Sequence, residues 1–92
     1  MAETKIEDLV SNLMLFVTLE TGKLPRPKRL AVERYMRTFV KSLTRHELEL
    51  YIGFYATNRS LDPDLTFKIN QASEGYNRYM SMRSRRQYYN HR

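Results

Sequence analysis

The residues best suited to acid–base or metal chemistry are few and scattered along this chain of 92 residues. The two histidines, His46 and His91, lie far apart in the sequence, and His46 falls in a stretch typical of a helix-capping turn. Asp62 and Asp64 flank Pro63, a pattern typical of a helix start, where carboxylates stabilise the first turn. Cysteine is absent, and no glycine-rich phosphate loop or nucleophile motif occurs. The sequence therefore predicts a non-enzyme with no catalytic residue, no metal site and no cofactor.

Positive charge is the stronger chemical signal. The net charge is +6, and residues 23–46 carry eight Lys and Arg against one acid, whereas residues 75–92 carry five Arg and no acid. Residues 1–22 and 47–74 are each net acidic. Either the helices pair by charge with one another, or separate faces bind separate partners. A basic face suits nucleic-acid phosphates and an acidic protein surface equally well. The candidates for binding an anionic partner are Arg26, Lys28, Arg34, Arg37, Lys41, Arg45, Arg83, Arg85 and Arg86.

The hydrophobic pattern that must position these residues is helical throughout. It predicts an all-α protein, a compact bundle of about four helices at residues 4–21, 27–43, 45–57 and 63–82. A chain of this length forms one domain with a thin core. We expect that domain to span residues 1–82. Residues 83–92 form a basic Arg/Tyr tail, which is either a frayed helical extension or a mobile segment.

Capping patterns predict where the helices begin and end. Thr4 with Glu7, and Thr44 with Glu47, each match the capping box, in which a hydroxyl and a carboxylate satisfy free backbone amides of the first turn. Gly22 is expected to end the first helix in a left-handed conformation.

Apolar spacing predicts which helix faces form the core. Helix 45–57 is apolar nearly all round, so we expect it at the centre of the core, with Gly53 at a close contact between helices. On helix 27–43 the predicted inward residues are Val32, Tyr35, Met36, Phe39, Val40 and Leu43. On helix 63–82 they are Leu65, Ile69, Ala72, Tyr76, and Tyr79 or Met80.

The first helix has more apolar surface than one packing face needs. Residues 12–20 read NLMLFVTLE, and Leu15 and Leu19 project outside the arc that faces the domain, beside Asp8 and Ser11. Either these leucines fold under the C-terminal segment, or another chain covers them, a second copy or a different protein. We favour the second interpretation. The candidate partner-binding residues are Ile6, Leu9, Val10, Leu13, Met14, Leu15, Val17 and Leu19.

Two stretches resemble a known family of transcription regulators. Ile6, Glu7 and Leu9 open an apolar first helix, and the later stretch EGYNRYMSM fits the pattern Glu-Gly-x-x-Arg-Tyr-x-x-Met. Both are similar to the AsiA anti-sigma factors of T-even phages. The resemblance implies an all-α protein whose first helix forms a homodimer and then binds the promoter-recognising C-terminal domain of the primary sigma factor. On this resemblance the partner surface is Ile6, Leu9, Val10, Leu13, Met14 and Val17.

The stretch SLTRHELELYIGFYATNRSL is also similar to the small nucleoid-modulating Hha proteins, which are helical and bind a DNA-associated protein. Together these features predict a phage-type regulatory protein that binds a sigma factor, RNA polymerase or a nucleoid-associated regulator through its first helix. The alternative is direct DNA or RNA binding by the basic face and the tail, and a third is a capsid or scaffold component. Because no apolar run could span a membrane and no signal-peptide pattern opens the chain, we expect a cytoplasmic protein.

Overall fold

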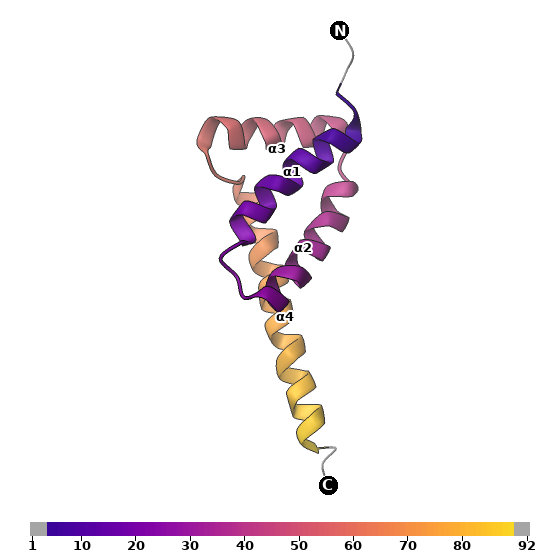
Figure 1. The fold of residues 1–92 in the computed structure, drawn as a ribbon, viewed down its shortest axis with the longest axis vertical. Coiled ribbons are helices and arrows are strands. Elements are labelled where there is room, and N and C mark those ends of the chain that lie inside the picture. The colour runs from indigo at the N-terminus through magenta and orange to yellow at the C-terminus, as the bar shows by residue number, and fades with distance from the viewer. Residues whose placement is uncertain (1–3, 90–92) are drawn as a thin grey trace.

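The computed structural model of the protein describes the backbone of residues 4–89 and the side chains of residues 4–84, and it confirms the all-α bundle (Figure 1). Four helices account for this range, in an order that matches the predicted one. They are α1 (Ile6–Thr21), α2 (Arg26–Lys41), α3 (Arg45–Asn58) and α4 (Pro63–Tyr89).

Helix α1 packs against both α2 and α3, and α2 also packs against α4. We call α1, α2 and α3 the body of the molecule. The core is aliphatic and draws on all four helices and the α3–α4 loop. A hydrogen bond supplements it: the buried Thr21 hydroxyl at the end of α1 donates to Glu33 Oε1 on α2 at 3.3 Å. The buried apolar residues are Leu9, Leu13, Met14, Val17, Val32, Met36, Val40, Leu48, Leu61, Leu65 and Ile69.

Local capping chemistry is confirmed at the start of α3. The Thr44 hydroxyl accepts a hydrogen bond from Glu47 N at 3.2 Å, and Thr44 N donates to Glu47 Oε1 at 3.0 Å. Asp62 Oδ1 likewise accepts from Asp64 N at 2.8 Å where α4 begins. Each pattern works because donor and acceptor lie within one turn of chain.

Both capping predictions for α1 are wrong, although the helix ends at Thr21 as predicted. The residue that precedes the helix is Lys5, with no side-chain capping bond, so the expected capping box of Thr4 and Glu7 does not form. Gly22 has φ −60°, in the right-handed region, so the helix does not end in a left-handed glycine. The left-handed position lies instead at Arg59, where φ is 57° and the backbone N–H donates to the Tyr55 carbonyl at the end of α3.

The prediction that α3 is the centre of the core is also wrong. Only Leu48 is buried on this helix, and Leu50 is exposed. A Cβ added to Gly53 would meet no atom within 4 Å, so this glycine marks no close contact. The physical reason is that α3 lies at the edge of the body and packs mainly one side against α1, which leaves the rest of its apolar surface partly in solvent (Figure 1).

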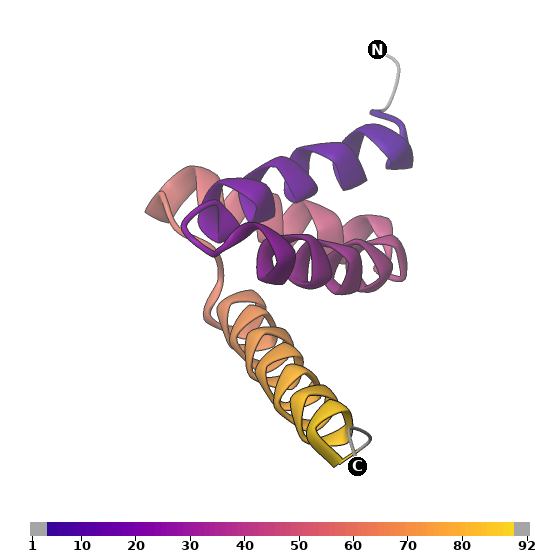
Figure 2. The same ribbon diagram turned by 60° about the horizontal axis from the view of Figure 1, so that its bottom comes forward.

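Helix α4 runs past its predicted end at residue 82 and continues to Tyr89. Its 27 residues make it about 40 Å long, and the molecule measures 67 × 23 × 19 Å. Only the first part of α4 lies beside the other helices, and the second part extends away from the body (Figures 1 and 2). The segment 83–89 is therefore a helical extension, and residues 90–92 lie outside the described residues. In the part of the chain that the structure describes, no helix is long and apolar enough to cross a membrane.

Candidate functional site

Two exposed leucines form the outer face of α1. The side chains of Leu15 and Leu19 are 57% and 60% exposed, and their spacing of four residues places them one turn apart on the same side of the helix. Exposed Asp8 and Ser11 flank them. Neither leucine folds under the C-terminal segment, because α4 leads away from α1 (Figure 2). We name the surface of these four residues the outer face of α1.

Half of the predicted partner-binding residues lie elsewhere. Leu9, Leu13, Met14 and Val17 are buried in the chain's own core, so their side chains are not accessible to a partner in this conformation. Since α2 and α3 pack against α1 and cover this side, four of the six residues of the face implied by the family resemblance are internal rather than exposed.

The remaining two predicted residues lie at the first turns of α1. Ile6 is exposed and Val10 is half-buried, and both line a shallow depression of about 360 Å³ with Glu7, Ser11 and Lys41. This depression joins the start of α1 to the end of α2. It places the basic side chain of Lys41 beside the apolar side chains of Ile6 and Val10.

The basic residues of α2 face solvent as predicted from their spacing. Arg26, Arg34, Arg37 and Lys41 are exposed, and Lys28 is half-buried. We name the four exposed residues the basic face of α2. Arg45 lies apart from them at the start of α3, where it forms an ion pair with Glu49 at 3.8 Å.

Among the described side chains, the charge blocks do not neutralise one another through ion pairs. Among the side chains of residues 4–84, the pair of Arg45 and Glu49 is the only ion pair within 4.0 Å, and it lies within one helix. The alternative in which acidic α1 pairs with basic α2 is therefore not what the structure shows. The arginines of α2 keep their charge available at the surface.

An apolar side chain interrupts the basic face. Leu30 is 51% exposed and lines a depression of about 270 Å³ with Glu33, Arg34 and Arg37. Sequence reasoning missed Leu30, although its position between arginines on a helix whose other side is apolar was the available signal. The surface thus combines cationic and aliphatic contacts.

The predicted basic residues of the tail are spread along the extension of α4. Arg83 is exposed, and Arg85 and Arg86 lie in its helical backbone. Their distance from α2 in the fold means that the structure does not gather them with the basic face of α2 into one patch (Figure 1).

The titratable groups near Asp62 and Asp64 have structural partners. The Tyr51 hydroxyl donates to Asp64 Oδ2 at 3.1 Å. Partial burial raises the pKa of Tyr51 to about 12, and the hydrogen bond to the Asp64 carboxylate adds to that shift. Asp62 caps α4 through the backbone of Asp64. Over the described range, no three His, Asp or Glu side chains form a group that could hold a metal ion.

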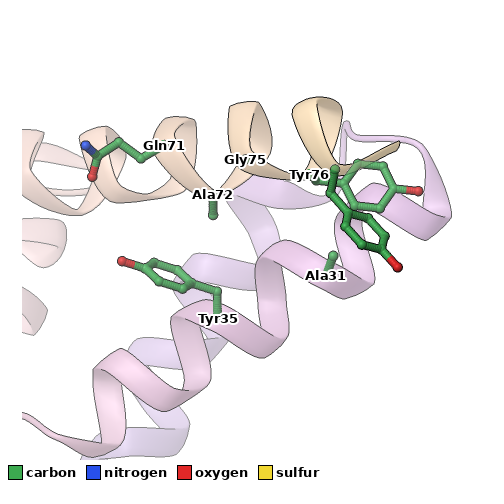
Figure 3. A pocket seen from close by; sticks show the side chains of 7 residues that line it. Ala31, Tyr35, Gln71, Ala72, Gly75 and Tyr76 are labelled. Carbon is green, nitrogen blue, oxygen red and sulfur yellow. The ribbon is translucent and has the colours of Figure 1, made fainter. Parts of the chain in front are cut away.

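A groove with a volume of about 510 Å³ lies between α2 and α4 (Figure 3). Ala31 and Tyr35 from α2 face Ala72 and Tyr76 from α4, and the lining is almost wholly apolar. The sequence pattern does not reveal this groove, because it predicts Tyr35, and Tyr79 or Met80, as inward residues. Tyr35 and Tyr79 are exposed.

No protein-family model matches the chain, and no curated protein and no solved structure matches it either.

Proposed function

We propose that the protein is a small, non-catalytic regulator that binds a protein of the transcription machinery through the outer face of α1. The observation that carries this proposal is the exposure of Leu15 and Leu19, one turn apart, on a helix whose opposite side is buried in the core. An isolated exposed leucine is ordinary, but two on successive turns provide the spacing by which a helix docks into an apolar groove.

The basic face of α2 supplies the second contact in this proposal. Leu30 lies among its arginines, and an aliphatic side chain gains nothing from a phosphate backbone. An acidic protein surface with some apolar area pairs with the charge of Arg37 and covers the Leu30 side chain. This combination supports a protein as the main partner over nucleic acid.

The class of partner rests on the sequence. The resemblance of residues 6–17 and 74–82 to the AsiA anti-sigma factors supports a sigma factor or RNA polymerase, acting in the bacterial cytoplasm. The similarity to Hha proteins supports the broader class of transcription-associated proteins. Because Leu9, Leu13, Met14 and Val17 are internal, docking uses the outer face of α1, with Ile6 and Val10 at its beginning.

Direct nucleic-acid binding is the second candidate function. It is favoured by the exposure of Arg34, Arg37 and Lys41, none of which belongs to an ion pair among the described side chains. These residues span about two turns, a reach that suits a phosphate backbone.

Affinity capture from bacterial lysate, with and without nuclease, separates the two functions. If the proposed function holds, RNA polymerase or a sigma factor is recovered in both conditions, and the Leu15→Asp, Leu19→Asp double variant loses it. The control variant Asn70→Asp adds a charge at an exposed position of α4, outside the outer face of α1, and retains it. Recovery of nucleic acid alone, abolished by Arg37→Glu and weakened steeply by salt, contradicts the proposal and supports the second candidate.

A further inference from the structure

The last turns of α4 project beyond the other helices in the part of the chain that the structure describes (Figures 1 and 2). The helix runs without a break from Pro63 to Tyr89, and its later turns extend past the body formed by the other helices (Figures 1 and 2). A solitary helical extension gains little stability from its own backbone, because most helix stability in proteins comes from packing an apolar side. The extension is therefore expected to meet a covering surface.

One side of α4 carries exposed apolar residues along most of its length. Phe67, Tyr79 and Met82 are 58%, 60% and 62% exposed. At 100° per residue, these three residues, together with Gln71 and Gly75, fall within an arc of about 120°, which also contains the charged residues Lys68 and Arg78. We name these five residues the α4 stripe. It begins on the turns of α4 that lie beside the other helices and continues toward the turns that project beyond them.

The middle of the stripe is open to close approach. A Cβ added to Gly75 would meet no atom within 4 Å, and Gly75 with Gln71 and Tyr79 borders the apolar groove between α2 and α4. Small residues on a helix surface allow another helix backbone to come near, and the adjacent groove has room for a large side chain.

The charges along α4 identify the partner that this stripe fits. The first half of the helix carries the exposed acids Asp64 and Glu74 against Lys68, a net charge of −1, whereas the half after Gly75 carries four arginines and no acid. Neither Glu74 nor Arg78 belongs to an ion pair within 4.0 Å among the described side chains. A second α4 in antiparallel orientation places the basic half of each copy beside the acidic half of the other, whereas a parallel one opposes like charges.

We propose that two copies of this chain associate through antiparallel packing of their α4 stripes, around a two-fold axis near Gly75 and Tyr76. These residues lie at the centre of the helix, since α4 spans Pro63–Tyr89. The axis brings Glu74 of each copy opposite Arg78 of the other, so the pair occurs twice. It also brings Tyr79 of each copy over Gln71 and Ala72 of the other, at the groove between α2 and α4. The interface is separate from the outer face of α1, so it does not depend on the proposed function.

Sedimentation equilibrium of the full chain tests this interface with a matched pair of glycine variants. Wild type is expected to show twice the chain mass of 11.1 kDa. Gly75→Leu has free space around its Cβ in one copy but blocks close approach at the axis, so dimerisation weakens at least tenfold. Gly53→Leu changes a helical glycine with equally free surroundings on α3 and leaves the dimer intact. Circular dichroism confirms that both variants are helical.

A wild-type chain that stays monomeric at millimolar concentration overturns the proposal, and so does a Gly75→Leu variant that dimerises like wild type.

A charge exchange tests the antiparallel orientation. Glu74→Arg and Arg78→Glu each weaken the dimer, and the double variant restores it, because the pair is then reversed rather than lost. A double variant no stronger than either single variant overturns the orientation. A dimer that is lost on Leu15→Asp with Leu19→Asp, but not on Gly75→Leu, overturns α4 as the interface.

Discussion

The rings of Phe16 on α1 and Tyr55 on α3 stack face to face, with centroids 4.0 Å apart and an angle of 3° between their planes. Phe16 follows directly after Leu15, so one residue holds α1 against its own chain while its neighbour points to solvent. The stack explains how α1 keeps its inner side fixed while its outer face stays accessible. The stack is a direct side-chain contact between α1 and α3.

Truncation of this stack should destabilise the fold. We expect Phe16→Ala to lower the free energy of unfolding by about 2–3 kcal/mol, since a half-buried aromatic ring and its partner contact are lost. For a domain of this size that corresponds to a fall in Tm of about 10 °C or more. Thermal unfolding followed by circular dichroism measures it. Leu15→Ala is the control, with an expected change within about 0.5 kcal/mol; equal losses in the two variants would contradict this packing of α1.

The capping box at the start of α3 gives a second prediction. Thr44→Ala removes the acceptor for Glu47 N, which lies 3.2 Å from the hydroxyl, and should cost about 1 kcal/mol of stability. Thr57→Ala in the same helix, at an exposed position, should be neutral or slightly stabilising because alanine has the higher helix propensity. Urea unfolding of both variants makes the comparison, and an unchanged midpoint for Thr44→Ala would show that the cap contributes nothing.

The Glu47 carboxylate should link stability to acidic pH. The hydrogen bonds from Thr44, the backbone one first, hold the pKa of Glu47 below its ordinary value of 4.5. A carboxyl with a lowered pKa in the folded state stabilises the fold above its unfolded pKa, and this contribution is lost as the pH falls through the folded pKa. We expect stability to decline below about pH 4.5 and Glu47→Gln to reduce that decline. An identical pH profile for the variant, measured by urea unfolding, would remove Glu47 as its source.

Tyr51 should have the opposite effect at alkaline pH. Its pKa rises from 10.0 to about 12, first through desolvation and then through its hydrogen bond to Asp64. A raised pKa of an acid stabilises the fold fully below the unfolded value, and the contribution disappears as the pH rises from about 10 to about 12. Ultraviolet titration should show one late-ionising tyrosine that is missing in Tyr51→Phe. If all tyrosines ionise together in the wild type, the Tyr51–Asp64 contact is absent in solution.

Contacts between residues one or two turns apart could be predicted from the sequence. Features that depend on how neighbouring helices are arranged could not. The Thr44 capping box and the buried triplet Val32, Met36 and Val40 follow from residues one or two turns apart, so a linear pattern contains them. Periodicity also identified Leu15 and Leu19 as lying outside the packing arc.

The errors share one physical cause. An apolar pattern shows which side of a helix avoids water, but not whether a neighbouring helix is long enough or near enough to cover it. For this reason the apolar spacing predicts α3 at the centre and Tyr35 in the core, whereas α3 lies at the edge and Tyr35 is exposed. The same limit hid the groove between α2 and α4, which depends on how these two helices diverge.

The most direct test of the central claim is the binding of purified RNA polymerase holoenzyme to the immobilised protein, measured by biolayer interferometry. Each fully covered leucine contributes about 1.5–3 kcal/mol, so Leu15→Asp with Leu19→Asp should weaken binding by at least about a hundredfold. Asn70→Asp, at an exposed position of α4, should bind like wild type. Absence of binding by the wild-type protein, or equal binding by wild type and the double leucine variant, would contradict the account.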